Sequence, residues 1–311
     1  MYHPYFRGKQ FELITIRETA AVMAAANFTP IIEPVKESMA GLQRALKTVC
    51  DAKGKAIVIV NPRHGVHAED GANISTLLKN EFLSKKEIAA GVLLSPSTTV
   101  EDAVECCKAH ADHDMAVIHA GFNDAKGLAD ALGDAAKKMR HVFFDSCSIL
   151  YRKHFSGAHR VLLRDGFKRR VRNRDYPAVE PFSDLHVTYE EQGMEGFGDF
   201  LMVGDEYSET GGPAYAVAIH LTFIDPTKDD EMYIYHFVSD TQDDPTDPGG
   251  KFAESLNALM KKLAQPNNHI FESSAVKEFR DLHARGHFPG LGSIKKLSMK
   301  HHIETLQNYF G

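Results

Sequence analysis

Two histidines and a basic run are the residues of this chain whose types best suit chemistry. His220 and His236 each lie within an apolar run, and the segment Lys168 to Arg174 holds five cations in seven residues. Arginine suits phosphate binding because its guanidinium group donates two parallel hydrogen bonds. We therefore predict an anion site here, with His220 as a candidate catalytic residue and Arg169, Arg172 and His236 as candidate ligand-binding residues.

Two structural alternatives are open for the same residues. The acids Asp165, Asp175 and Glu180 lie close to the basic run in sequence and would turn it into a salt-bridged loop. The two histidines would lie on a hairpin and face each other or a polar cavity. In these alternatives the residues support the fold rather than bind a ligand.

A second group of polar residues follows the apolar runs that we predict to be strands. In an α/β barrel the chemistry lies just past the C-terminal ends of the strands. Glu33 lies inside the apolar run Pro30 to Val35, so we expect it to be partly buried and to need a partner such as Arg7 or Lys36. The candidate acids, bases or metal ligands of this group are Glu33, Asp145 and Asp205. Its candidate ligand-binding residues are Arg7, Lys9, Lys36, Asn61, Arg63, His119 and Arg164.

Two members of the polar set also have a structural interpretation. His119 ends the apolar run that starts at Met115, and it suits a hydrogen-bonded core histidine equally well. The loop His64 to Asp70 has two histidines and two acids, but its spacing matches no established zinc site. We therefore predict no metal-ligating residue from a motif. No cofactor is indicated, and a divalent metal is compatible with the acids without being indicated by a motif.

The elements that would position these residues alternate between apolar runs and amphipathic helical patterns, which is typical of βαβ units and a parallel sheet. Eight strands favour a closed (β/α)8 TIM-like barrel, an α/β fold, over an open doubly wound sheet, and no Gly-x-Gly-x-x-Gly follows the first strand. Thr99 and Asp102 predict a capping box at a helix start. The predicted strands are 3–6, 30–35, 55–60, 89–94, 115–119, 141–145, 160–164 and 199–203.

The second half of the chain predicts additions to this barrel. Two apolar runs, 215–224 and 232–239, flank the turn Asp225 to Asp230 and indicate an antiparallel hairpin. We predict one structural unit. Its barrel spans 1–248, including a long loop at 165–198 and the hairpin at 214–239, and its C-terminal helical extension spans 249–311.

Composition narrows the class of protein. The chain has 311 residues and a net charge of −6, which excludes a generic nucleic-acid binder. The four cysteines fit neither a zinc pattern nor a disulfide scaffold, and we find no signal peptide and no membrane-spanning run. We expect a reduced, cytoplasmic protein without a membrane partner.

The segments Tyr2 to Leu13 and Pro30 to Val35 resemble the beta-protein family of bacterial and phage proteins. Those proteins also begin with a short strand, a turn containing Arg or Lys, and a Pro-x-x-Glu strand. The motifs Gly196 to Phe200 and Gly211 to Thr222 are similar to those of an uncharacterised bacterial branch of that family. The resemblance implies a barrel-like fold, a bacterial origin and a phage-defence or mobile-element context. It implies no activity or catalytic residue.

Two functional hypotheses follow. In the first, the barrel binds a phosphorylated or other anionic small molecule and hydrolyses it. In the second, the protein is a non-catalytic sensor or scaffold subunit that binds a partner protein or nucleic acid through residues 168–174. The sequence leaves open whether the protein is an enzyme.

Overall fold

The computed structural model describes residues 1–209, 212 and 214–311. The chain divides into two compact units. Unit 1 comprises Met1–Asp165 and Thr188–Phe200, and unit 2 comprises Gly166–Val187 and Leu201–Gly311. The predicted organisation differs, because it placed 1–248 in one barrel and only 249–311 outside it. Gly211, the first residue of the Gly211–Thr222 motif, lies outside the described residues.

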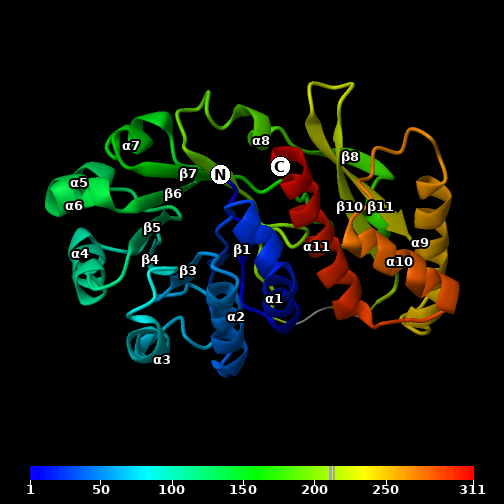
Figure 1. Cartoon of the computed structure of the whole chain (residues 1–311), viewed down its shortest axis with the longest axis horizontal. Helices are drawn as coiled ribbons and strands as arrows, with labels where there is room; N and C mark the ends of the chain where they lie inside the picture. The colour runs from blue at the N-terminus through cyan, green and yellow to red at the C-terminus, as the bar shows by residue number, and fades with distance from the viewer. Residues whose placement is uncertain (210–211, 213) are drawn as a thin grey trace. The chain divides into compact units, whose positions relative to one another are not determined.

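Unit 1 is a (β/α)8 barrel, which confirms the predicted fold class (Figure 1). Eight parallel strands follow one another around the ring, and the last one returns to the N-terminal segment. Closure is made by a parallel bridge between Tyr2 and Phe197 and by a 2.9 Å hydrogen bond from the Tyr5 backbone N–H to the Asp199 carbonyl. The strands are β1 (Tyr5–Phe6), β2 (Ile31–Ile32), β3 (Ala56–Ile59), β4 (Ile88–Leu94), β5 (Met115–His119), β6 (Arg140–Phe144), β7 (His159–Leu163) and β9 (Gly196–Gly198).

The strands are apolar on both faces because each face is covered. One set of side chains fills the barrel interior, including Ile57, Ile118, Val142 and Phe200. Helices lie outside the ring (Figure 1). Because side chains alternate along a strand, the other set faces these helices. The helices of unit 1 are α1 (Gln10–Ala25), α2 (Ala40–Asp51), α3 (Ala72–Leu77), α4 (Val100–Ala109), α5 (Ala125–Leu132), α6 (Asp134–Lys138) and α7 (Ile149–Lys153).

Local sequence explains how several of these helices start and stop. Thr99 and Asp102 form the predicted capping box at the start of α4. Residues 124–138 are alanine-rich but form two helices, α5 and α6, because Gly133 adopts a φ of 54° between them. α3 continues directly into a π-helical turn, η1 (Leu78–Phe82).

The segment predicted as a long barrel loop, 165–198, has its own secondary structure. It contains the 3₁₀ turn η2 (Asn173–Asp175), the strand β8 (Val179–Ser183) and the short helix α8 (Leu185–Thr188). The eighth barrel strand was predicted at 199–203, but it is Gly196–Gly198. Glycine is needed there, because a Cβ on Gly198 would lie only 2.1 Å from the His3 carbonyl oxygen.

Unit 2 is built on a three-stranded antiparallel sheet in the order β10-β11-β8. β10 (Ala218–Asp225) and β11 (Glu231–Val238) form the predicted hairpin. One face of the hairpin carries Ile219, Leu221 and Phe237 into a core with three helices. These are α9 (Pro248–Leu263), α10 (Ser274–Arg285) and α11 (Leu291–Phe310).

Both edges of this sheet are protected from pairing with another strand. On the β10 edge, the ring of His301 in α11 lies 2.8 Å from the Thr222 carbonyl through its Nε2 atom. The neighbouring His302 lies 2.9 Å from the Thr222 hydroxyl through its Nδ1 atom. On the other edge, β8 contains Pro181, which lacks the N–H that an added strand would need.

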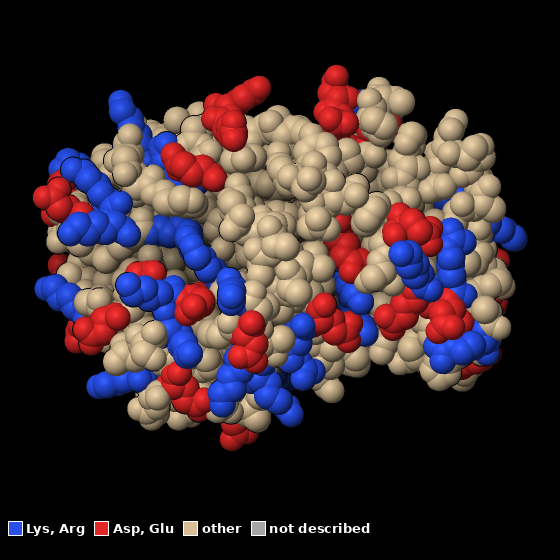
Figure 2. Space-filling view, viewed as in Figure 1, with Lys and Arg blue, Asp and Glu red and all other residues tan. Residues whose placement is uncertain are grey.

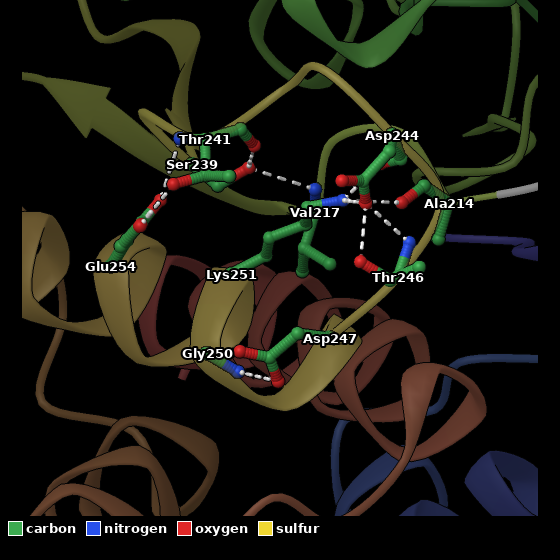
Figure 3. A network of polar contacts seen from close by, with 10 residues as sticks. All are labelled: Ala214, Val217, Ser239, Thr241, Asp244, Thr246, Asp247, Gly250, Lys251 and Glu254. Atoms are coloured by element: carbon green, nitrogen blue, oxygen red, sulfur yellow. Dashed lines mark hydrogen bonds and ion pairs between the residues drawn. The ribbon is translucent and has the colours of Figure 1, made fainter.

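A buried lysine organises the loop 240–250 that leads into α9 (Figure 3). Lys251 is 2% exposed, and its Nζ donates to the carbonyl oxygens of Ala214 and Asp244. The Asp244 carboxylate accepts from the Thr246 backbone N–H at 2.7 Å. Asp247, in the left-handed conformation, caps α9 by accepting from the Gly250 N–H at 2.9 Å.

Among the described residues, no helix is both long enough and apolar enough to cross a membrane.

Candidate functional site

The predicted site residues fall into two groups, one in each unit. Unit 1 contains Glu33, Asp145, Arg7, Lys9, Lys36, Asn61, Arg63, His119 and Arg164. Unit 2 contains Asp205, His220, Arg169, Arg172 and His236. Each group is therefore described separately.

At the C-terminal end of the barrel strands, Glu33 is fully buried and both of its carboxylate oxygens are occupied. Oε2 accepts from the Tyr5 hydroxyl at 2.8 Å and pairs with the Arg7 guanidinium, as the sequence predicted for Arg7. Oε1 accepts from the Arg63 backbone N–H at 2.9 Å. The Arg7 guanidinium also lies 4.9 Å from the centre of the Tyr5 ring. These contacts neutralise the charge of Glu33 and hold the side chain in one position.

The other predicted residues at this end of the barrel are also tied to neighbours. Arg164 donates from Nε to Asp145 at 2.8 Å, in an ion pair that is partly open to solvent. The Asn61 amide group exchanges two hydrogen bonds with the Leu93 backbone, at 2.8 and 2.9 Å. Lys9 is half-buried at the start of α1, and Lys36 is exposed.

His119 faces away from the barrel interior. Its Nδ1 lies 2.7 Å from the Tyr151 hydroxyl of α7, and its Nε2 lies 3.0 Å from Nδ1 of His141. Its ring stacks on Phe143, with the centroids 4.6 Å apart, and burial lowers the pKa of His119 well below its usual value. The ring is therefore packed between the sheet and the helix layer, which is the structural alternative described above.

In unit 2, His220 and His236 are paired across the hairpin. Their Nδ1 atoms are 2.7 Å apart, so one ring donates a hydrogen bond to the other. This arrangement matches the predicted alternative in which the two histidines face each other. His236 is 5% exposed and His220 is half-buried, so both residues are largely shielded from solvent.

Three residues outside the hairpin complete the cluster around the two histidines. The Glu180 Oε1 atom, on β8, lies 3.2 Å from His236 Nε2, and neither atom has an aligned hydrogen bond among the described residues. The other Glu180 oxygen accepts from Arg170 at 2.8 Å. The Tyr176 ring stacks on His236, with the centroids 4.6 Å apart. The segment that follows the basic run is thus folded back onto this face of the sheet.

Burial and neighbouring cations keep both rings neutral near pH 7. Burial, followed by the charge of Arg170, lowers the pKa of His236 to about 4. Burial, the His236 ring and Lys295 lower the pKa of His220 well below its usual value. A neutral imidazole has one donor and one acceptor nitrogen, so the pair can relay a proton.

The contacts from Glu180 to His236 and from His236 to His220 bear on which ring nitrogen carries each proton. The Glu180 carboxylate, 3.2 Å from His236 Nε2, favours the His236 tautomer with its proton on Nε2, and in that tautomer His236 Nδ1 accepts from the Nδ1–H of His220. His220 Nε2 is then the unprotonated nitrogen. A carboxylate that orients one ring, which orients a second, follows the logic of hydrolytic triads.

Three predicted residues of unit 2 remain, Arg169, Arg172 and Asp205. Arg169 lies 3.7 Å from the Glu206 carboxylate, and Arg172 is exposed without an ion pair to the described residues. Asp205 is half-buried in the segment before the hairpin. Sequence reasoning missed the roles of Arg170, Tyr176 and Glu180, although Glu180 was noted as a neighbour of the basic run.

No group of three or more His, Cys, Asp or Glu side chains within 1–209, 212 and 214–311 is placed to hold a metal ion. In the loop His64 to Asp70, the ring of His67 is buried, with its Nε2 atom 3.1 Å from the Lys36 carbonyl oxygen. This contact joins the loop to the backbone at Lys36.

Comparison with known proteins finds only distant structural similarity. No protein-family model and no curated protein matches the chain. A mutant O-GlcNAc hydrolase from Thermobaculum terrenum is similar over 65% of this chain, with 13% identity and a TM-score of 0.39, and the match spans about half of the hydrolase, 54%. N-acetylneuraminate lyase from Mycoplasma synoviae is similar over 64% of this chain and 67% of its own, with 14% identity and a TM-score of 0.39. The class of the protein, a (β/α)8 barrel with a second unit, is defined by its own strand order.

Proposed function

We propose that this protein binds a phosphorylated or otherwise anionic small molecule on the histidine face of unit 2 and hydrolyses it. The observation that supports this proposal most directly is the chain of contacts from Glu180 through His236 to His220. Barrel-mouth residues support it less, because the carboxylate of Glu33 is occupied by three protein partners.

The proposed mechanism uses His220 as a general base. Its Nε2 takes a proton from water, and the resulting positive charge is shared with His236 and stabilised by Glu180. Exposed Arg172, together with Arg169, binds the anionic group of the substrate. The resemblance to the beta-protein family supports a bacterial phage-defence or mobile-element setting as part of the proposal.

The second candidate is a sensor or scaffold subunit without catalysis. One observation favours it: Val171 is 98% exposed between the cations of the basic run. An exposed apolar side chain flanked by Lys168, Arg170 and Arg172 suits an acidic protein surface or a nucleic-acid backbone.

Hydrolysis of p-nitrophenyl phosphate and of bis-p-nitrophenyl phosphate tests the first candidate. We expect the His220→Gln variant to lose about 100-fold or more in kcat, as general bases typically contribute. The matched control is His283→Gln, which changes an exposed histidine on α10. Circular dichroism establishes that both variants are folded.

Full turnover by His220→Gln would exclude His220 as the base. A folded wild-type protein that hydrolyses neither ester contradicts the hydrolytic proposal for phosphate esters. Binding of an acidic peptide or an oligonucleotide that is lost in Arg172→Gln would then favour the sensor or scaffold.

A further inference from the structure

A cavity of about 240 Å³ lies at the N-terminal ends of the barrel strands. Its lining includes the first residues of four strands, Ala56 of β3, Met115 of β5, Arg140 of β6 and His159 of β7. Chemistry in barrels of this kind takes place at the opposite, C-terminal end of the strands. The cavity is therefore separate from the barrel-mouth residues, and all of its lining lies in unit 1.

Cations dominate the charged side chains that line this cavity. Two carboxylates, Glu87 and Asp114, face five cationic side chains. These are Lys55, Lys86, Lys137, Lys138 and Arg140. Figure 2 shows Lys and Arg side chains, with Asp and Glu side chains among them, over the part of the barrel where Figure 1 labels β3 to β6. The net charge of the protein is −6, so the molecule as a whole does not attract anions. A local excess of positive charge can attract them at this cavity.

These cations have few partners within the protein. Lys137 pairs with Asp134 at 3.2 Å, but the other four make no ion pair with the described residues. Arg140 is half-buried, and its Nε has no hydrogen-bond partner there. Burial lowers the pKa of Arg140 and, together with the Arg140 charge, that of His159. The Arg140 guanidinium therefore places a positive charge in the cavity lining, beside the carboxylate of Asp114.

We propose that this cavity binds a small polyphosphate ion of the pyrophosphate class. Lysines from the β3 and β4 side and cations from α6 and β6 surround the cavity, which favours an anion with several charges over a single carboxylate. The volume is below the ~300 Å³ at which ordinary small-molecule pockets begin, so an ion fits better than a nucleotide. The site binds its ligand without chemistry, and it does not depend on the proposed function of unit 2.

Isothermal titration calorimetry of the full chain with sodium pyrophosphate tests this site, with inorganic phosphate as the weaker ligand. We expect the double variant Lys86→Ala/Lys138→Ala to weaken pyrophosphate binding at least tenfold, because each lost charge-assisted contact costs about tenfold. Both lysines are exposed, so the variant should fold. The matched control is Lys108→Ala, an exposed lysine in the last turn of α4 outside the cavity.

The titration is repeated in Arg172→Gln, which removes the anion-binding side chain proposed for unit 2. Retained binding in that variant, with loss in the double lysine variant, supports the barrel cavity and separates it from the unit 2 proposal. The inference is overturned when the double lysine variant binds pyrophosphate as tightly as the wild type. It is equally overturned when the wild type shows no heat at millimolar pyrophosphate, or when Lys108→Ala weakens binding to the same extent.

Discussion

Glu33 is a buried carboxylate with either a structural or a catalytic role. Measuring both the stability and the turnover of a Glu33 variant distinguishes the two roles. The Arg7 guanidinium is 3% exposed beside it, so removing the negative charge leaves a buried cation without its partner. We expect Glu33→Gln to lower the free energy of unfolding by about 3 kcal/mol, as for other broken buried pairs. Urea unfolding followed by circular dichroism measures this change.

The matched control for Glu33→Gln is Asp145→Asn, which breaks the partly exposed pair with Arg164 at the same end of the barrel. A surface pair contributes about 1 kcal/mol or less, so this variant should be nearly as stable as the wild type. A Glu33→Gln protein of unchanged stability but lower turnover would contradict the structural role and restore Glu33 as a catalytic candidate.

The tautomers of His220 and His236 make a second residue-scale prediction. We expect nitrogen-15 NMR of the histidine rings at pH 7 to show His236 protonated on Nε2 and His220 protonated on Nδ1. Glu180→Gln, which keeps the shape but removes the carboxylate, should disturb the His236 signals first. Observation of His220 protonated on Nε2 would remove its role as a general base.

Part of each residue cluster was predictable from sequence. Glu33 inside an apolar run required a partner, and Arg7 was one of two cations near enough in the predicted fold to supply it. The contact between His220 and His236 was one of two alternatives given for the predicted hairpin, and the observed register pairs them. Glu180 was not predictable, because its approach to His236 depends on a third strand that joins the hairpin from a distant part of the chain.

At the scale of elements, the buried Lys251 links the start of α9 to the loop before it. Replacement by Met keeps the length of the side chain but leaves the carbonyl oxygens of Ala214 and Asp244 without their donor. We expect Lys251→Met to lower the free energy of unfolding by about 2 to 3 kcal/mol and to increase proteolysis within 240–250. Lys261→Met, on an exposed position of the same helix, should change neither measurement.

Elements with a strong local signal were predicted well, and elements made by tertiary contacts were not. The first seven barrel strands, the hairpin and the α4 capping box agree with the structure within a few residues. β8 carries Pro181 at an exposed edge, so its own residues favour a loop. β9 is Gly-Phe-Gly, whose glycines weaken strand propensity and are retained because the N-terminal segment approaches so closely. The spacing of apolar residues indicates which segments are buried in a core. β8 and β9 form because they pair with neighbouring strands, and this pairing leaves no such pattern in their own residues.

For the whole molecule, buried histidines predict sensitivity to acid. Burial lowers the pKa of His301 to about 4, against about 6.5 in an unfolded chain. Between these values the unfolded state binds the proton more strongly, so this contribution to stability is complete above pH 6.5 and lost as the pH falls toward 4. We expect His301 alone to cost about 2 kcal/mol between pH 7 and pH 5, measured by urea unfolding. The dependence on pH should be shallower in His301→Gln than in His283→Gln, and equal slopes would contradict the assignment.

The two units have separate hydrophobic cores. We therefore expect a destabilising substitution in one unit to leave the stability of the other unchanged. Local opening follows the packing of each core, so a variant should raise amide exchange mainly in its own unit. Hydrogen–deuterium exchange of Glu33→Gln should increase in peptides from 1–165 and 188–200 and remain at the wild-type level in 214–311. His301→Gln should give the reverse pattern, since His301 joins α11 to β10 within unit 2.

The chain passes between the units at 165–166, 187–188 and 200–201. If these crossings couple the two units strongly, either variant would increase exchange in both units. That result would make the barrel and the second unit one cooperative folding unit, despite their separate cores.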